Sequence, residues 1–204
     1  FWNRFIDYRS FKLLELKGKK RMRIYSITVR NYRPFKELRE VKFGQLTTIV
    51  GKNDAGKSSI LRAIQLFFER NPKIDSDDIS DYADLDEDAL IEIAFTSLPQ
   101  EIEIEEGVKT SFKEEMLLDK NDCLRIRKFY PRDNPTKVRI SLITQDFNYD
   151  SFSGLINLRE AELNKKCEES GIDFTKAGRG ITNKDKRKAL RNKAKEMGIE
   201  IGEY

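Results

Sequence analysis

The sequence predicts an α/β fold in which a strand, a glycine-rich loop and a helix follow one another. Around this unit we expect mixed and antiparallel strands, and after it a helical segment. Three observations support this prediction. The stretch Gly51–Ser58 matches the pattern G-x-x-x-x-G-K-[ST] at every fixed position. The apolar, β-branched run 46–50 precedes it, and a helical pattern follows it up to Asn71-Pro72. Together these features predict the P-loop NTPase fold class.

The elements before the loop begin at Met22, which resembles a natural translation start. Residues 1–21 are basic and lack an initiating Met, so we expect them to be an upstream or non-native segment. Along 25–29, apolar and polar residues alternate with the period of a half-buried strand. A turn is expected at 31–35, and the run 46–50 is expected to form a buried strand.

The loop has the residue types that a phosphate group requires. Gly51 and Gly56 allow backbone turns closed to other residues and bring amide groups near phosphate oxygens. Lys57 is expected to reach the β- and γ-phosphates of ATP, and the Ser58 hydroxyl is expected to bind Mg²⁺. An ordinary glycine turn and a loop that no longer binds nucleotide are the alternatives. The residues expected to bind the nucleotide are Gly51, Asn53, Asp54, Ala55, Gly56, Lys57, Ser58 and Ser59.

Beyond the helix, which we expect to end near Arg70, comes an acidic surface loop from 74 to 88. Four strands are then predicted, at 89–95, 101–105, 124–129 and 138–143. The last two flank a turn-rich connection and are expected to pair in antiparallel fashion.

After Asp150 the pattern becomes helical. One helix is expected from Gly154 to Ser170, stopped by Gly171. A second is expected from a capping box at 182–185 to Gly198. The predicted domains are therefore an ATP-binding lobe at 22–150 and a helical segment at 151–204, the start of an insertion or arm.

Composition limits the function classes. Hydrophobic residues make up 38% of the 204 residues and charged residues 36%, and no apolar run approaches membrane-spanning length. The chain has no histidine, which excludes histidine-dependent nucleophilic catalysis and histidine zinc sites within it. The two cysteines, Cys123 and Cys167, lack a partner motif, so a reducing cytoplasm is the simplest setting and no membrane partner is expected.

Charge is segregated along the chain. Residues 74–106 hold thirteen acidic and no basic side chains, whereas residues 176–195 hold nine basic side chains and one acidic one. Contact with DNA is one interpretation of the basic segments, and a solvated helix face is the other.

The segments 27–35 and 50–64 together resemble the N-terminus of ABC-type ATPases of the SMC/RecF/OLD group. That group has a strand ending in Asn-(Phe/Tyr)-(Arg/Lys)-x-(Phe/His), followed by Gly-x-Asn-x-x-Gly-Lys-(Ser/Thr)-x-x-Leu-x-Ala-Ile. Asn53 separates the chain from most small GTPases and kinases. Asp54 is more similar to the OLD-type ATPases (overcoming lysogenization defect) and to antiphage relatives such as the Gabija ATPase-nuclease.

The resemblance implies further site residues. Arg33 would lie near the bound nucleotide, and Asn53 would order the loop and face the γ-phosphate. Gln145, after a predicted core strand, would contact Mg²⁺ or the attacking water. Arg33 as a solvated turn arginine and Gln145 as a plain strand-end residue are the alternatives.

The chain departs from the group's pattern in lacking the Leu-Ser-x-Gly signature and an apolar strand ending in Asp-Glu. No catalytic residue is therefore assigned within it, and hydrolysis is expected only as part of a larger chain. The first hypothesis is an ATP-binding lobe of a DNA repair or antiphage ATPase that forms a homodimer of heads and works with a downstream or separate nuclease. The second is a nucleotide-sensing module that controls a partner effector. A stand-alone P-loop kinase is a weaker third.

Overall fold

The computed structural model describes residues 22–204 except 53–54, 70–71, 73, 75–77, 81–86, 135–136 and 175–179. The segment 1–21, expected to be non-native, lies outside the described residues. The chain divides into two compact units. Unit 1 contains the described residues up to Leu98 and Cys123–Leu142, and unit 2 contains Pro99–Asp122 and Ile143–Tyr204. The domain bounds 22–150 and 151–204 stay a prediction.

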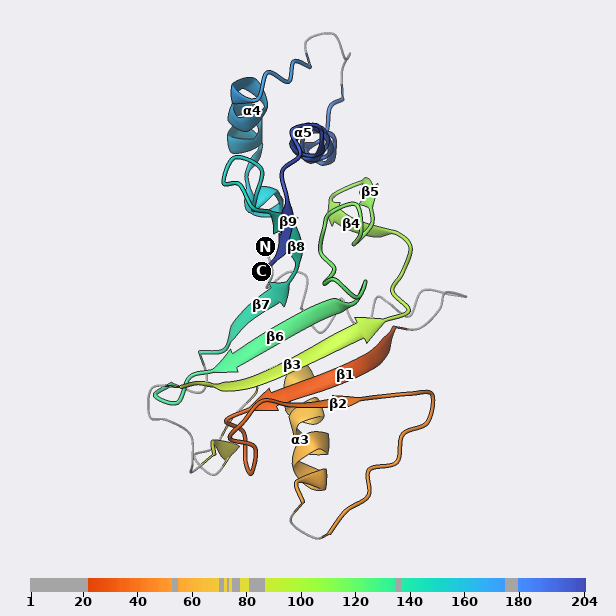
Figure 1. Ribbon diagram of the computed structural model, residues 1–204, viewed down its shortest axis with the longest axis vertical. Helices are drawn as coiled ribbons and strands as arrows, with labels where there is room; N and C mark the ends of the chain where they lie inside the picture. Colours follow the sequence, from red (N-terminus) through yellow and green to blue (C-terminus); the bar gives the residue numbers. More distant parts are fainter. Residues whose placement is uncertain are drawn as a thin grey trace. The chain divides into compact units, whose positions relative to one another are not determined.

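Unit 1 is a five-stranded sheet with a helix on one face (Figure 1). The strand order is β2-β1-β3-β6-β7, and β1 pairs antiparallel with both β2 and β3, as β3 does with β6. The predicted strands at 89–95, 124–129 and 138–143 are confirmed, and β6 and β7 are neighbours in the sheet. The elements are β1 (Arg23–Arg30), β2 (Arg39–Lys42), α3 (Lys57–Phe68), β3 (Ala89–Thr96), β6 (Leu124–Tyr130) and β7 (Arg139–Ile143).

Strand alternation sets which face of the sheet meets α3. Ile91, Ile93 and Phe95 lie on one face of β3, and the Phe95 ring contacts Phe67 of α3 at 6.4 Å between centroids. The buried residues of α3 recur at helical spacing, at Ser59, Ile60, Ala63, Leu66 and Phe67. The core of unit 1 therefore lies between α3 and this face, with β1 adding Ile27 and Val29.

The prediction of a buried strand at 46–50 is wrong. No strand is assigned there, and Leu46 and Val50 are 89% and 82% exposed. Figure 1 shows this stretch within a long connection between β2 and α3. An apolar, β-branched run becomes a buried strand only where another strand offers hydrogen-bond partners, and no strand of the described residues pairs with it.

Unit 2 packs two helices around a small apolar core. The core includes Phe147, Phe152, Leu155, Leu163, Cys167, Leu190 and Ala194. Two short antiparallel pairs complete the unit: β4 with β5, which are consecutive strands, and β8 with β9, which lie on either side of the two helices in the sequence. Of these four strands, the sequence predicts only β4, as the strand at 101–105. The other three strands have three residues each, and so short a strand carries almost no periodic signal. The elements are β4 (Ile102–Glu105), β5 (Val108–Thr110), β8 (Gln145–Phe147), η2 (Leu155–Asn157), α4 (Glu160–Glu169), α5 (Asn183–Glu196) and β9 (Ile201–Glu203).

Three of the four predicted helix ends of unit 2 are confirmed, but the predicted start at Gly154 is wrong. The 3-10 turn η2 and the extended residues Leu158 and Arg159 come first, and α4 begins only at Glu160. Thr182 caps α5, and its side chain accepts a hydrogen bond from the Asp185 amide while Asp185 accepts one from the Thr182 amide. Gly171 and Gly198 follow the two helices with positive φ of 69° and 68°. Glycine adopts this conformation without steric cost, which explains why both helices end there.

Candidate phosphate-binding loop

The loop between 51 and 58 leads directly into the N-terminus of α3. The Ala55 amide donates to the Lys52 carbonyl at 3.2 Å, which closes a turn inside the loop. Gly56 has φ 81° and ψ 10°, in the left-handed region, and stands immediately before the first helical residue, Lys57. Asn53 and Asp54 lie outside the described residues, so their predicted contacts stay a prediction.

The N-terminus of α3 has the electrostatics of an anion site. The first amides of a helix have no intrahelical acceptor, and the helix dipole places partial positive charge there. Among the described residues no side chain caps α3, and no acidic residue lies in its first turn. The exposed Ser58 is the second residue of that turn, whereas Ser59 is buried. A phosphate at this position would receive backbone donors and a favourable dipole.

Lys57 adds a full positive charge to the loop. Its ammonium donates to the carbonyls of Gly51 at 2.8 Å and of Lys52 at 2.5 Å, so the side chain folds back across the loop. An ammonium has three donors and no acceptor. The Lys57 ammonium, which the motif predicts to bind the β- and γ-phosphates, therefore lies beside the loop backbone that precedes α3.

The turn 31–35 comes into contact with this loop through Phe35. A methyl group built on Gly56 would overlap the Phe35 ring, and Gly56 itself is buried. The sequence singled out Phe35 only as part of a motif and missed this contact. The signal that could have indicated this contact is the position of an aromatic residue directly after the turn-forming Arg33-Pro34 pair.

Arg33 is held by an acidic partner. Its Nε donates to Asp78 Oδ1 at 2.8 Å, its amide donates to the Asp78 carbonyl at 2.8 Å, and its guanidinium lies 5.7 Å from the centre of the Tyr32 ring. Burial would lower the pKa of Arg33, but the hydrogen bond to Asp78 and the charges of Tyr32 and Asp78 together outweigh burial and raise that pKa. Burial, followed by the charge of Asp78, raises the pKa of Tyr32 to about 12. A direct role of Arg33 toward nucleotide stays a prediction.

Gln145 lies in unit 2, at the start of β8. Gln145 is the strand partner of Glu203 in β9, and its backbone N–H donates to the Leu118 carbonyl at 3.1 Å. Its predicted role toward Mg²⁺ or water is not tested by this placement.

The basic helix α5 is largely occupied by contacts inside unit 2. Lys186, Arg187 and Arg191 are 6%, 3% and 8% exposed. Arg187 and Arg191 both bind Glu115, and Lys186 pairs with Glu160 at 2.9 Å. Neither the DNA-contact interpretation nor the solvated-face interpretation describes these three residues. Lys188 and Lys195 are exposed.

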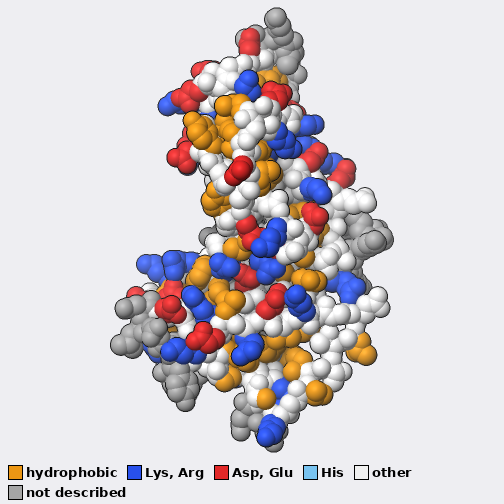
Figure 2. Space-filling model, viewed as in Figure 1, with side chains coloured by type: hydrophobic (Ala, Val, Ile, Leu, Met, Phe, Trp, Pro, Cys, Tyr) orange, Lys and Arg blue, Asp and Glu red, His pale blue; other side chains and the backbone are white. Residues whose placement is uncertain are grey.

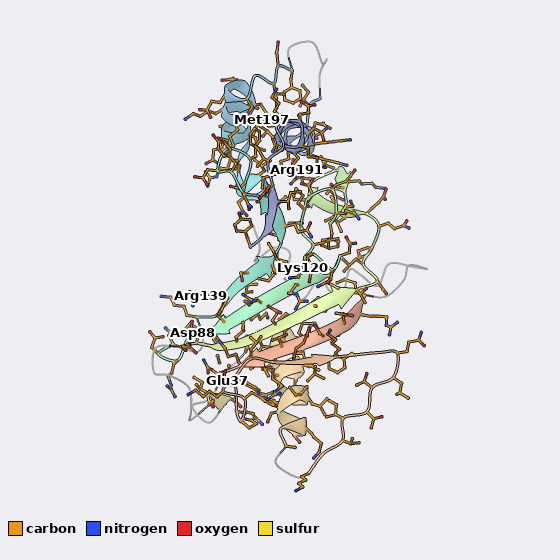
Figure 3. All side chains as sticks on the ribbon, in the orientation of Figure 1. Glu37, Asp88, Lys120, Arg139, Arg191 and Met197 are labelled. Carbon is orange, nitrogen blue, oxygen red and sulfur yellow. The ribbon has the colours of Figure 1, made fainter. Side chains whose placement is uncertain are left out.

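Elsewhere the charges are mixed. On the face seen in Figure 2, basic and acidic side chains are interspersed over the surface. At the end of the sheet where β3 and β7 begin, for example, Asp88 and Arg139 lie together in Figure 3 and form an ion pair. Within the part of the chain that the structure describes, no helix is both long and apolar enough to cross a membrane.

A 44-residue alignment relates the chain to an uncharacterized protein of Methanocaldococcus jannaschii at 48% identity. It covers 22% of this chain and 20% of that protein, so the chain matches well under two thirds of that relative's length. The AAA ATPase domain family matches residues 22–199, a span that includes the loop, the Phe35 turn and most of both units. Membership in it implies nucleotide binding, typically with Mg²⁺. On this match over most of its length, the chain belongs to the AAA ATPase domain family.

Proposed function

We propose that this chain is the ATP-binding lobe of an SMC/RecF/OLD-like ATPase that acts in DNA repair or antiphage defence. The observation that carries the proposal is the left-handed Gly56 directly before α3, together with the Lys57 ammonium, which lies on the loop carbonyls of Gly51 and Lys52. Backbone amides, helix dipole and a positive side chain converge there, which suits the triphosphate of ATP. Ser58, exposed in the first turn, is the proposed ligand of Mg²⁺.

The test is Mg-ATP binding by isothermal titration calorimetry and by thermal stabilisation of the whole chain. Lys57→Ala is expected to abolish measurable stabilisation, because it removes the charge facing the β- and γ-phosphates. Lys52→Ala is the matched control, since Lys52 is an exposed lysine of the same loop outside the fixed motif positions. Equal stabilisation of wild type and Lys57→Ala would contradict the site.

ATP-dependent association of two such lobes is part of the proposal. Leu46, Val50 and Leu61 are exposed apolar residues that flank the loop in the sequence, and burying them would favour association. An increase in mass with Mg-ATPγS by light scattering, absent in Lys57→Ala, would support it. A monomer at every nucleotide concentration would count against it.

DNA and a downstream or separate nuclease are the proposed partners. The exposed cations Lys188 and Lys195 are better candidates for DNA contact than the buried cations of α5. DNA binding that weakens with salt, and weakens less steeply after Lys188→Ala and Lys195→Ala, would support contact through this helix.

A nucleotide-sensing module that controls an effector is the second candidate. One observation favours it: the described carboxylates Asp78, Asp88 and Glu92 are each engaged by arginine side chains. A carboxylate held in this way is poorly placed to activate water for phosphoryl transfer. If the pure chain binds ATP without hydrolysing it, the result fits both candidates. If a variant that binds but does not hydrolyse ATP still controls an effector protein, the result favours the second candidate.

A further inference from the structure

The turn 31–35 is closed by its own backbone hydrogen bonds and contacts the phosphate loop through Phe35. The amides and carbonyls of Tyr32 and Phe35 exchange two hydrogen bonds, at 3.1 and 3.0 Å, and the Asn31 amide donates to the Lys36 carbonyl at 3.2 Å. Two residues, Arg33-Pro34, connect Tyr32 to Phe35, and Arg33 has a φ of 49°. A positive φ at the first position is a feature of tight two-residue connections.

The same turn is anchored to the acidic segment that follows α3. The Ser80 amide donates to the Asn31 carbonyl at 3.1 Å, and the Asn31 side chain donates to Glu87 Oε2 at 2.7 Å. Arg33 adds the backbone and side-chain contacts to Asp78 described above. Tyr32 is fully buried and forms a β-bridge with Ile79. Contacts with residues 78–80 and Glu87 thus hold the turn in place and limit the movement of Phe35.

Gly56 is the point at which Phe35 meets the loop. A glycine with positive φ is normally free to leave that conformation, because it lacks the steric limits of other residues. With a ring packed on its Cα, a change in the Gly56 backbone would have to displace Phe35. The contact therefore restrains the residue that directs the first amides of α3.

We propose that Phe35 is a positioning residue of the phosphate loop, and that it holds Gly56 in the conformation that binds phosphate. The inference rests on the proposed nucleotide site and adds a residue that would not touch the nucleotide. Restraint of the loop before binding lowers the ordering cost that the ligand would otherwise meet. The turn also links the loop to residues 78–80 and to Glu87, because these residues and the loop all contact residues 31–35.

The first experiment needs no nucleotide. Hydrogen exchange of the whole chain is followed in peptides that cover residues 51–60, in wild type, Phe35→Ala and Phe68→Ala. Phe68 packs at the other end of α3, against Phe67 and Phe95, and serves as the control for general loss of packing. We expect exchange in 51–60 to be about tenfold faster in Phe35→Ala alone. Unchanged exchange in Phe35→Ala, or an equal increase in Phe68→Ala, would overturn the proposal.

The second experiment measures Mg-ATP affinity in the same variants and in Phe35→Leu. We expect about tenfold weaker binding for Phe35→Ala and partial recovery for Phe35→Leu, which refills part of the space beside Gly56. Wild-type affinity in Phe35→Ala would overturn the proposal. If wild type itself bound no Mg-ATP, the proposed function would fail, and the exchange experiment would still decide whether Phe35 holds the loop.

Discussion

Gly56 is subject to two separate restrictions. Its φ of 81° is strained for a residue with a side chain, and a Cβ there would overlap the Phe35 ring. The first restriction belongs to the backbone and stays whatever surrounds it. The second depends on one neighbour and can be removed by mutation, so the two are separable by a double-mutant cycle.

Gly56→Ala is expected to destabilise the chain by about 2 kcal/mol or more in the wild-type background. In the Phe35→Ala background the overlap is absent, and we expect the cost of Gly56→Ala to fall to about 1 kcal/mol, the strain alone. Urea unfolding of the four proteins gives the coupling. Strictly additive effects would show that the ring does not press on Gly56.

Lys128 is a buried lysine at the opposite end of α3. Lys128 is 6% exposed, and its ammonium donates to the Phe67 carbonyl at 2.7 Å. The same ammonium lies 4.8 Å from the centre of the Phe67 ring. Burial lowers its pKa to about 8. Between that value and its unfolded pKa of about 10.4, the unfolded chain holds a proton that the folded chain has released. Lys128 therefore makes the free energy of unfolding rise with pH across this window.

Lys128→Met removes this rise while keeping an unbranched side chain of similar length. Relative to wild type, the variant is expected to lose about 2 kcal/mol of stability between pH 7 and pH 10. Urea titrations at several pH values check the difference, with the exposed Lys137→Met as control. Parallel pH profiles of wild type and Lys128→Met would contradict a depressed pKa.

At the scale of elements, α5 shows how a helix that is basic by sequence can be internal by structure. Glu115 is 1% exposed and receives Arg187 Nε at 2.8 Å, Arg191 Nη1 at 3.0 Å and the Thr110 hydroxyl at 3.0 Å. Arg191 also donates to the carbonyl of Glu114 at 2.7 Å. Figure 3 labels Arg191 at α5. These bonds join α5 to the segment 110–115 within unit 2.

The pKa of Glu115 follows from this network. Burial would raise it, but hydrogen bonds from Arg187 and the charge of Arg191 outweigh burial and lower it. A carboxyl with a depressed folded-state pKa stabilises the fold above its unfolded value. That contribution is lost as the pH falls through the folded-state pKa.

Glu115→Gln is expected to cost about 3 kcal/mol at pH 7, because it removes the carboxylate that pairs with the buried Arg191 and leaves the buried Arg187 with Glu105 as its remaining ion-pair partner. The cost should shrink in strong acid, where the wild-type carboxyl is protonated as well. Glu114→Gln is the matched control, since Glu114 is 50% exposed and its pair with Lys184 is a surface pair worth at most about 1 kcal/mol. Equal effects of the two variants on urea unfolding would contradict the network.

Features that depend on neighbouring residues could be predicted from the sequence, and features that depend on distant residues could not. Local signals were sufficient where local chemistry decides: the capping box at Thr182, the stops at Gly171 and Gly198, and the helix after Lys57. They were insufficient where a distant partner decides. The burial of Arg187 depends on Glu115, 72 residues away, and nothing near Arg187 in the sequence reveals that carboxylate.

At the scale of the whole molecule, four of the five strands of unit 1 were predicted, and β2 (Arg39–Lys42) was missed. Alternation of side-chain types along a strand records which face is buried. β6 alternates buried and half-buried residues along its whole length. The prediction for 46–50 was wrong because burial of this run would need a neighbouring strand, and none of the described strands pairs with it. The contact between Phe35 and Gly56 joins residues 21 positions apart, and only the folded turn brings them together.

The exposed run 46–50 has a further consequence, for solubility. Leu-Thr-Thr-Ile-Val is uncharged, rich in β-branched residues and free of proline, which is the composition that stacks into cross-β assemblies. The chain is therefore expected to aggregate in a concentration-dependent way, with thioflavin-positive particles. Thr48→Lys, a charge placed on an exposed position of the run, should delay this, whereas Ser151→Lys, at an exposed position outside the run, should not. Residues that lead into the phosphate loop would then also set how concentrated a solution of this protein can become.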